Sequence, residues 1–334
     1  TVKAKKAVEL DAASSDVSVA VTFGAAGGGS AGVGGSVAGV GVANTTQAII
    51  EGGAGVAGGA KVSVSGGELE VSANEFSSAW QATGAGAGGG AAGVGVSLAV
   101  GVNASTTKAK IGDYAETNAS GTTSVHADSV ENLNTVTVAG AGGGSAGVAG
   151  TIAASVVVSH TEAGIGKHAK VNQDNSFTNA AQSVDVKATD RVVTVNASGA
   201  GAGGGAAGVG ATLNVTFAKN TTAAYIDNNA EVSAGKDVLV EASSEKFVNS
   251  AAIAGAGGGA AGVAGAVSVI AVGSLLDGEA KSGLGNGDAA SYSDGQTTKS
   301  AVGDQLGNSA QASETRGVLD AKASKMAVGS HMDD

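Results

Sequence analysis

The stretch GAGAGGGAAGVG occupies residues 84–95 and returns unchanged at residues 199–210. It contains the spacing G-x-G-x-x-G, which in a dinucleotide-binding loop lets a phosphate approach bare backbone. The acidic residue that would hold a ribose about 20 residues later does not follow. A nucleotide site also has no need of copies at fixed intervals. We therefore interpret the stretch as part of a structural repeat.

The first glycine of each GGG triplet marks one repeat unit, and the spacings between these anchors are 61, 54, 61 and 54 residues. Fifteen residues before each anchor, an alanine closes an alternating stretch such as LEVSA (69–73) or VLVEA (238–242). Alternation with a period of two predicts strands with one buried face. The five anchors are Gly27, Gly88, Gly142, Gly203 and Gly257.

Downstream of the anchors the first four units also keep their register. Isoleucine stands 23 residues after each anchor, at Ile50, Ile111, Ile165 and Ile226, and alanine stands 27 residues after it, at Ala54, Ala115, Ala169 and Ala230. The seven-residue difference between units follows this alanine. We therefore expect a change of loop length that leaves the strands in place.

Composition favours an extended repeat structure over ordinary globular domains. Glycine fills 58 of 334 positions, the apolar 43% is mostly alanine and valine, and aromatic residues make up 3%. So few bulky side chains predict a thin, evenly spread core, because ordinary cores are densely filled by large residues. A single unit would bury too little surface, whereas stacked units supply each other's walls. Proline, which would interrupt a hydrogen-bonded ladder, is absent.

These features predict an all-β fold over residues 1–276, a β-solenoid of the right-handed parallel β-helix type. At about 18–20 residues per coil, we expect a 54-residue unit to make roughly three turns. Residues 277–334 break the pattern and are expected to form an irregular loop, a cap or a tail, with a short helix over residues 309–326. Acidic residues cluster there at Asp277, Glu279, Asp288, Asp294 and Asp304.

Calcium is the one cofactor left open, because it favours such oxygen ligands. The glycine runs lack the aspartates of calcium-binding β-rolls, however, so we favour a solvated loop. No residue is predicted to be catalytic, to bind a cofactor or to ligate a metal. His160, Glu162 and His168 fall in one unit without counterparts in the others, and we interpret them as unrelated surface residues.

Two further patterns concern the surface. Phe76 and Trp80 lie four residues apart, so alternation places them on one face of a strand, where they pack together or contact a sugar; we favour packing. The pairs Thr45-Thr46, Thr106-Thr107 and Thr221-Thr222 are interpreted as turn residues, since asparagine precedes two of them. One pair in three coils is too sparse for an ice-binding array. Three triplets also read as glycosylation acceptors, beginning at Asn44, Asn103 and Asn220.

The net charge of −11 argues against nucleic acid and anionic lipid as partners. The uncharged runs 84–102 and 135–158 are long enough to span a bilayer. Their apolarity comes from glycine, alanine and valine, and no consistent Lys/Arg bias flanks them, so membrane insertion is a lesser alternative. The absence of cysteine excludes disulfides and thiolate metal sites.

The pattern V-x-V-x-A, then VAGAGAGGGAAGVG and SLAV, then N-T-T-x-A-x-I-G-x-x-A resembles the repeats of large bacterial filamentous-haemagglutinin-like adhesins, including leukotoxin-type filamentous adhesins. The likeness covers roughly residues 8–272. It implies autotransporter or two-partner export, a β-helical stalk and attachment to cells or matrix, with no catalytic residue.

From this resemblance we expect a secreted or cell-surface protein that forms a rigid stalk or filament segment, with a cell-surface or matrix ligand. A regular solenoid without caps leaves its end strands unpaired, so we also expect self-association end to end. A β-helical carbohydrate-active enzyme is the alternative from another class, although no Ser-His-Asp or paired-acid constellation stands out. The N-terminal TVKAKKAVELDA has no hydrophobic signal core, so we expect a piece of a longer protein or a processed product. The receptor, the organism and the export route stay open.

Overall fold

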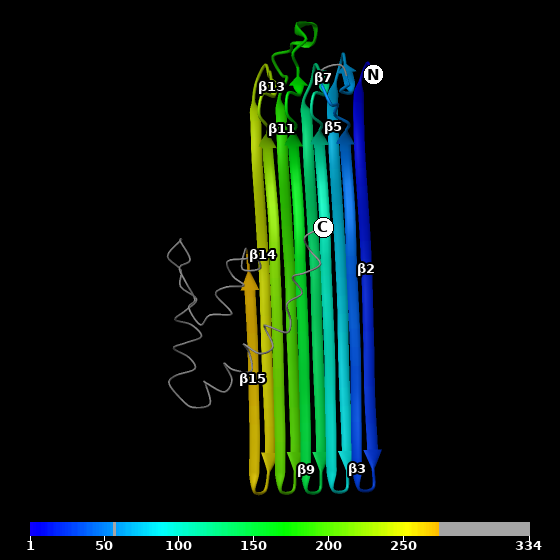
Figure 1. The fold of residues 1–334 in the computed structure, drawn as a ribbon, viewed down its shortest axis with the longest axis vertical. Helices are drawn as coiled ribbons and strands as arrows, with labels where there is room; N and C mark the ends of the chain where they lie inside the picture. Colours follow the sequence, from blue (N-terminus) through cyan, green and yellow to red (C-terminus); the bar gives the residue numbers. More distant parts are fainter. Residues whose placement is uncertain (56–57, 274–334) are drawn as a thin grey trace, which may run out of the picture. The chain divides into compact units, whose positions relative to one another are not determined.

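Each glycine-anchored unit folds into one turn of a parallel β-solenoid, made of one short and two long strands (Figure 1). The computed structural model describes residues 1–55 and 58–273. In this part of the chain there are fifteen strands and no α-helix, so the prediction of an all-β solenoid is confirmed. The predicted segment 277–334, with its acidic residues and any calcium site, lies outside the described residues.

The strands form three five-stranded parallel sheets in which neighbours follow chain order. The short sheet consists of β1 (Val2–Ala4), β4 (Lys61–Val64), β7 (Glu116–Ala119), β10 (Lys170–Val171) and β13 (Glu231–Val232). The first long sheet consists of β2 (Ala7–Gly28), β5 (Glu68–Gly89), β8 (Thr123–Gly143), β11 (Val184–Gly204) and β14 (Val238–Gly258). The second long sheet consists of β3 (Ala31–Ile50), β6 (Ala92–Ile111), β9 (Ala146–Ile165), β12 (Ala207–Ile226) and β15 (Ala261–Val272).

The expectation of three turns per unit is wrong, because one unit makes one turn. Ala7 pairs with Glu68, and Leu69 pairs with Thr123, so each residue lies beside its equivalent in the next unit. The long strands run for 20–22 residues in the first four turns. At about 3.3 Å per residue such a strand extends about 70 Å, whereas five turns about 4.8 Å apart advance only about 20 Å. The solenoid is therefore a slab, broad along its strands and short along its axis.

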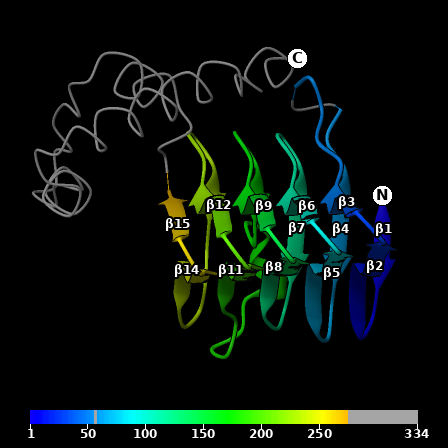
Figure 2. The ribbon, with the colours of Figure 1, turned by 90° about the horizontal axis from the view of Figure 1, so that it is seen from below.

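The two long sheets face each other as two rows (Figure 2), and glycine lets them come close. A Cβ atom on Gly89, the second glycine of its triplet, would lie 2.0 Å from the carbonyl oxygen of Ala92 in the facing strand. The equivalent glycines of the other four turns give 1.9–2.1 Å to the equivalent alanines. The anchor Gly88 points the other way and would meet nothing within 4 Å. The glycine runs therefore serve close packing of sheet on sheet, as the repeat predicts.

The interior changes character along the strands. Next to the short sheet it is apolar, with Ile111, Ile165, Leu69 and Val71 fully buried. Serine, threonine, asparagine and carboxylate side chains fill the middle. Alanine and glycine fill the far end, next to the two-residue links between the long strands. The predicted isoleucine column therefore belongs to the most strongly apolar part of the core.

The two 61-residue units place their additional residues in different loops. In the first unit six of the seven precede the short strand, between Ile50 and Lys61. In the third unit all seven follow it, between Val171 and Val184, where a short 3₁₀ helix, η1 (Asn175–Phe177), forms. The strand register is unaffected, as expected. Ala54 is nevertheless not the equivalent of Ala115, because it lies exposed in the first loop and Ala60 packs against the core instead.

Candidate functional site

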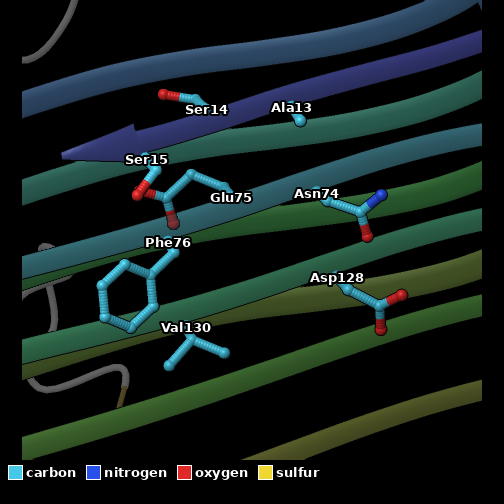
Figure 3. A pocket seen from close by; sticks show the side chains of 8 residues that line it. All are labelled: Ala13, Ser14, Ser15, Asn74, Glu75, Phe76, Asp128 and Val130. Atoms are coloured by element: carbon cyan, nitrogen blue, oxygen red, sulfur yellow. The ribbon is translucent and has the colours of Figure 1, made fainter.

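A shallow hollow of about 320 Å³ lies on the outer face of the first long sheet (Figure 3). It forms where Ala13 and Ser15 of β2 stand beside the larger Asn74 and Phe76 of β5. Small side chains on one strand and large ones on the next leave a step in an otherwise flat sheet. The hollow is lined by Ala13, Ser14, Ser15, Asn74, Glu75, Phe76, Asp128 and Val130.

An aromatic row continues from this hollow along β5. Phe76 and Trp80 both point outward and are 40% and 50% exposed. Four residues further on, Gly84 has no side chain, and the ring of Phe23 from β2 takes its place: a Cβ atom on Gly84 would lie 2.6 Å from Phe23 Cδ2. Phe76, Trp80 and Phe23 thus form a row with steps of about 13 Å, because four strand residues span that length.

The structure confirms that Phe76 and Trp80 share one face, but the interpretation that they pack within the solenoid is wrong. The inward positions beside them, such as Ser77 and Ala79, are fully buried, so alternation leaves the two rings outside. Large aromatic surfaces left half exposed in a flat row are typical of contact surfaces for other molecules.

Polar side chains form one edge of the aromatic row. The Asn74 amide donates to Asp11 Oδ1 (3.1 Å) and to Ser72 Oγ (2.9 Å), and the Ser72 hydroxyl donates to the same Asp11 oxygen (2.7 Å). This network fixes the Asn74 side chain beside Phe76. The exposed rings can stack on a ligand, while the fixed Asn74 amide and the Asp128 carboxylate can form hydrogen bonds to the same ligand.

A second cluster is enclosed between the long sheets. Inward positions on neighbouring turns carry Asp16, Glu75, Glu131 and Asp190, and the last three are at most 4% exposed. Asn44 donates to Glu75 (3.0 Å), and Asn220 donates to Asp190 (2.7 Å). Ser159 and Thr161 donate to Asp190 as well. Glu75, Glu131 and Asp190 are buried inside the slab, whereas Asp16 is half-buried on the strand at its edge.

Glu131 is the most perturbed member of this cluster. Burial raises its pKa to about 7, and the negative charges of Asp190 and Glu75 act in the same direction, while hydrogen bonds from Ser105 and Ser129 oppose the shift. Ser129 Oγ lies 2.5 Å from Glu131 Oε1 and 2.8 Å from Glu75 Oε2, yet it has one proton to donate. Glu131 Oε2 has no hydrogen-bond partner. This carboxyl group therefore exchanges its proton near neutral pH.

The interpretation of the asparagine–threonine groups as turns is wrong. Asn44, Asn103 and Asn220 lie inside β3, β6 and β12 and point inward, where Asn103 donates to Ser77 (2.7 Å) and the other two donate to carboxylates. Their amide nitrogens donate hydrogen bonds in the polar middle of the core, so no turn is needed to account for these residues. The three predicted glycosylation acceptors are correspondingly turned away from solvent.

The spacing of the threonine pairs also differs from the expectation, because each unit makes one turn and equivalent positions therefore lie on neighbouring turns. The outward positions carry Thr45, Thr106, His160 and Thr221 on consecutive turns, so the premise of one pair in three coils is wrong. His160 nevertheless interrupts the column. Lys108 and Glu162 stand two residues further along their strands, at neighbouring outward positions. An uninterrupted threonine array is therefore not present on this face.

His160, Glu162 and His168 do not form a common site. Glu162 accepts hydrogen bonds from Lys108 (2.8 Å) and from the Tyr225 hydroxyl, and His160 Nε2 lies 3.4 Å from it. Burial raises the pKa of Glu162, but the Lys108 and Tyr225 interactions outweigh it and lower the net pKa.

His168 instead stacks on the Tyr114 ring, with 4.8 Å between centroids. Within residues 1–55 and 58–273, no three His, Cys, Asp or Glu side chains come together in a way that would hold a metal ion.

The uncharged runs 84–102 and 135–158 fold into β5, β6, β8 and β9. In the described part of the chain no helix has the length and apolarity to cross a membrane. No known protein family matches the sequence, and neither a characterised protein nor a solved structure is significantly similar to it.

Proposed function

We propose that this chain is an extracellular structural and adhesive segment, one piece of a secreted or cell-surface filament that attaches to cells or matrix. The proposal combines a mechanical role for the stacked turns with an attachment role for the outer face of the first long sheet. It follows the resemblance to filamentous bacterial adhesins noted for the repeats.

The mechanical role is supported by the continuous backbone ladders. The strands of the first long sheet pair in register over their whole length in all five described turns. Parallel strands that are hydrogen-bonded on both sides resist bending and local opening, and each inner turn supplies the walls of its neighbours. The solenoid gains little length per residue, because each turn of 54 or 61 residues adds only about 4.8 Å along the axis. The role is therefore that of a broad, stiff filament segment rather than a thin stalk.

The attachment role is supported by one observation above all, the row of Phe76, Trp80 and Phe23 beside the hollow. Exposed aromatic side chains carry much of the energy at protein contact surfaces. The ligand is proposed to be a molecule on a cell surface or in the matrix that lies flat along β5.

We propose no catalytic step for this surface. Glycoside hydrolysis needs two carboxylates placed about 5–10 Å apart around the scissile bond. Asp128 lines the outer hollow, whereas the Glu75 carboxylate accepts hydrogen bonds from Asn44 and Ser129 in the interior. These contacts leave one carboxylate for the outer hollow, which fits binding better than hydrolysis.

The test is an adhesion assay with the full chain coupled to beads. Wild-type beads are expected to bind cultured cells or immobilised matrix more strongly than albumin-coated beads. Trp80→Ala and Phe76→Ala should each reduce this binding at least fivefold, because each removes a ring from the row. Phe247→Ala is the matched control, since Phe247 is also an exposed aromatic of the first long sheet but lies on β14, away from the row.

Equal binding by wild-type and albumin beads across cells, matrix proteins and glycans would contradict the attachment role. Equal loss in the Phe247 control would place the contact elsewhere on the sheet. Turnover of a polysaccharide by the purified chain would favour the enzymatic alternative instead.

A further inference from the structure

Both ends of the described stack present unpaired long strands. β2 and β3 form the outer edge of the first turn, and β14 and β15 form the outer edge of the fifth. No described strand pairs with these edges, and the edge strands carry no proline, which would block pairing. Rows of free backbone N–H and C=O groups are templates for another strand of the same length.

The most exposed large apolar side chains of the described residues also gather at these edges. Each one with more than 60% of its surface exposed belongs to β2, β3, β14 or β15: Val17, Val19, Val21, Phe23, Val33, Val37, Ile253 and Val263. The register within the stack gives their relations. If a first turn followed the fifth, Ile253 would stand beside Phe23, and Val263 would stand beside Val33.

The interior column of charges is complementary at the two ends. One inward position carries Asp16, Ser77, Glu131, Val192 and Lys246 on successive turns. Lys246 is the one basic residue at an inward position of the described long strands, and its neighbour within the stack is the fully buried Val192. Among the described residues, its ammonium group donates one hydrogen bond, to Ser244 Oγ at 3.2 Å. Asp16, at the opposite edge, accepts from Ser14 (3.3 Å).

We infer that the chain stacks end to end with a second copy of itself, the fifth turn of one copy pairing in register with the first turn of the next, and that Lys246 and Asp16 form an enclosed ion pair at this junction. The inference rests on the proposed role as a filament segment and specifies its partner and its register. In this arrangement β14 continues onto β2 and β15 onto β3, so the parallel ladders pass from copy to copy.

One pair at the junction opposes stacking. Glu241 would stand beside Asp11 on the outer face. Both positions face water, where like charges are strongly screened, and Lys187 lies 3.8 Å from Glu241 as a neighbouring countercharge. The Lys246–Asp16 pair is enclosed between the sheets, where screening is weak. The Lys246–Asp16 attraction therefore outweighs the Glu241–Asp11 repulsion and favours the in-register pairing of the two copies.

The test measures self-association of the full chain by sedimentation velocity over a range of protein concentrations. Wild type is expected to form linear assemblies that grow with concentration. Lys246→Glu and Asp16→Lys each place like charges at the junction and should weaken association at least tenfold. Glu245→Lys, which reverses a charge at an outward position of the same edge strand, is the control and should change association less than threefold.

A mixture of the two charge-reversal variants provides the decisive measurement. Glu at position 246 of one copy meets Lys at position 16 of the other, and Lys246 of the second meets Asp16 of the first, so mixing should restore association to near the wild-type level. Misfolded variants would not recover on mixing.

The inference is overturned if wild type stays monomeric, if either reversal associates as wild type does, or if the mixture does not recover. A monomeric wild type would also remove the filament part of the proposed function. The other two outcomes would leave that function standing, and the bead assay measures attachment independently of stacking.

Discussion

Replacing Glu131 by glutamine should remove a large pH dependence from the stability of the solenoid. Burial raises the pKa of this carboxyl group from the ordinary 4.5 to about 7. A raised pKa means that the folded state holds the proton more tightly than the unfolded state. The stabilisation is therefore complete below pH 4.5 and is lost as the pH rises through about 7. Glutamine carries no such proton.

The magnitude follows from the two pKa values. Between pH 5 and pH 8 the Glu131 contribution to the free energy of unfolding falls by about 2–3 kcal/mol. The free energy of unfolding of Glu131→Gln minus that of wild type should therefore rise by about 2–3 kcal/mol over this range. Any constant cost of burying the amide cancels in this comparison, because it is the same at each pH.

Urea denaturation followed by circular dichroism at half-unit pH steps measures this difference. Histidines ionise in the same range, so variant and wild type are compared at each pH, which cancels their contribution. Glu70→Gln, at an exposed outward position of β5, controls for the loss of one negative charge. Its free energy of unfolding relative to wild type should not change with pH. If the free energy of unfolding of Glu131→Gln relative to wild type stays constant with pH to within about 0.5 kcal/mol, Glu131 does not bind its proton more tightly in the folded state.

Four other substitutions test the packing between the sheets and the hydrogen bonds of Glu162 on the second long sheet. Gly89→Ala should lower the free energy of unfolding by about 2 kcal/mol or more, since its Cβ would lie 2.0 Å from a backbone oxygen; Gly88→Ala, in open space, should cost less than about half of that, as urea midpoints would show. Leu133→Ala empties a fully buried site and should cost about 3 kcal/mol in the same assay. Tyr225→Phe removes a hydrogen bond to Glu162 and should raise the pKa of that carboxyl group, measured by carbon-13 NMR titration.

The strands and the role of glycine were predictable because they depend on local pattern. Alternation with a period of two marks buried faces, and five copies at fixed spacing require stacking. The number of turns per unit was not predictable from an average coil length, since that average assumes short strands. Four consecutive polar residues at 44–47 and at 219–222 also interrupt the alternation, which concealed the fact that one long strand continues through each group.

The candidate sites were predictable in part. Aligning the units by anchor would have placed the four carboxylates in two neighbouring interior columns, with Glu75 and Asp190 thirteen residues before their anchors and Asp16 and Glu131 eleven residues before theirs. The shared face of Phe76 and Trp80 followed from their spacing. The third member of the aromatic row did not, because Phe23 comes from a neighbouring strand and leans over a glycine.

The two rims of the slab, where the long strands begin and end, differ in how they accommodate inserted residues. Links between the two long strands are two residues long in all five turns, with the preceding glycine pressed against a carbonyl, whereas the loops bordering the short sheet already vary by several residues without shifting the ladder. Foreign peptides grafted between Val171 and Val184 should consequently be displayed along one rim of the scaffold, while grafts at the opposite rim would pry the sheets apart. The molecule offers a one-sided platform for engineered display.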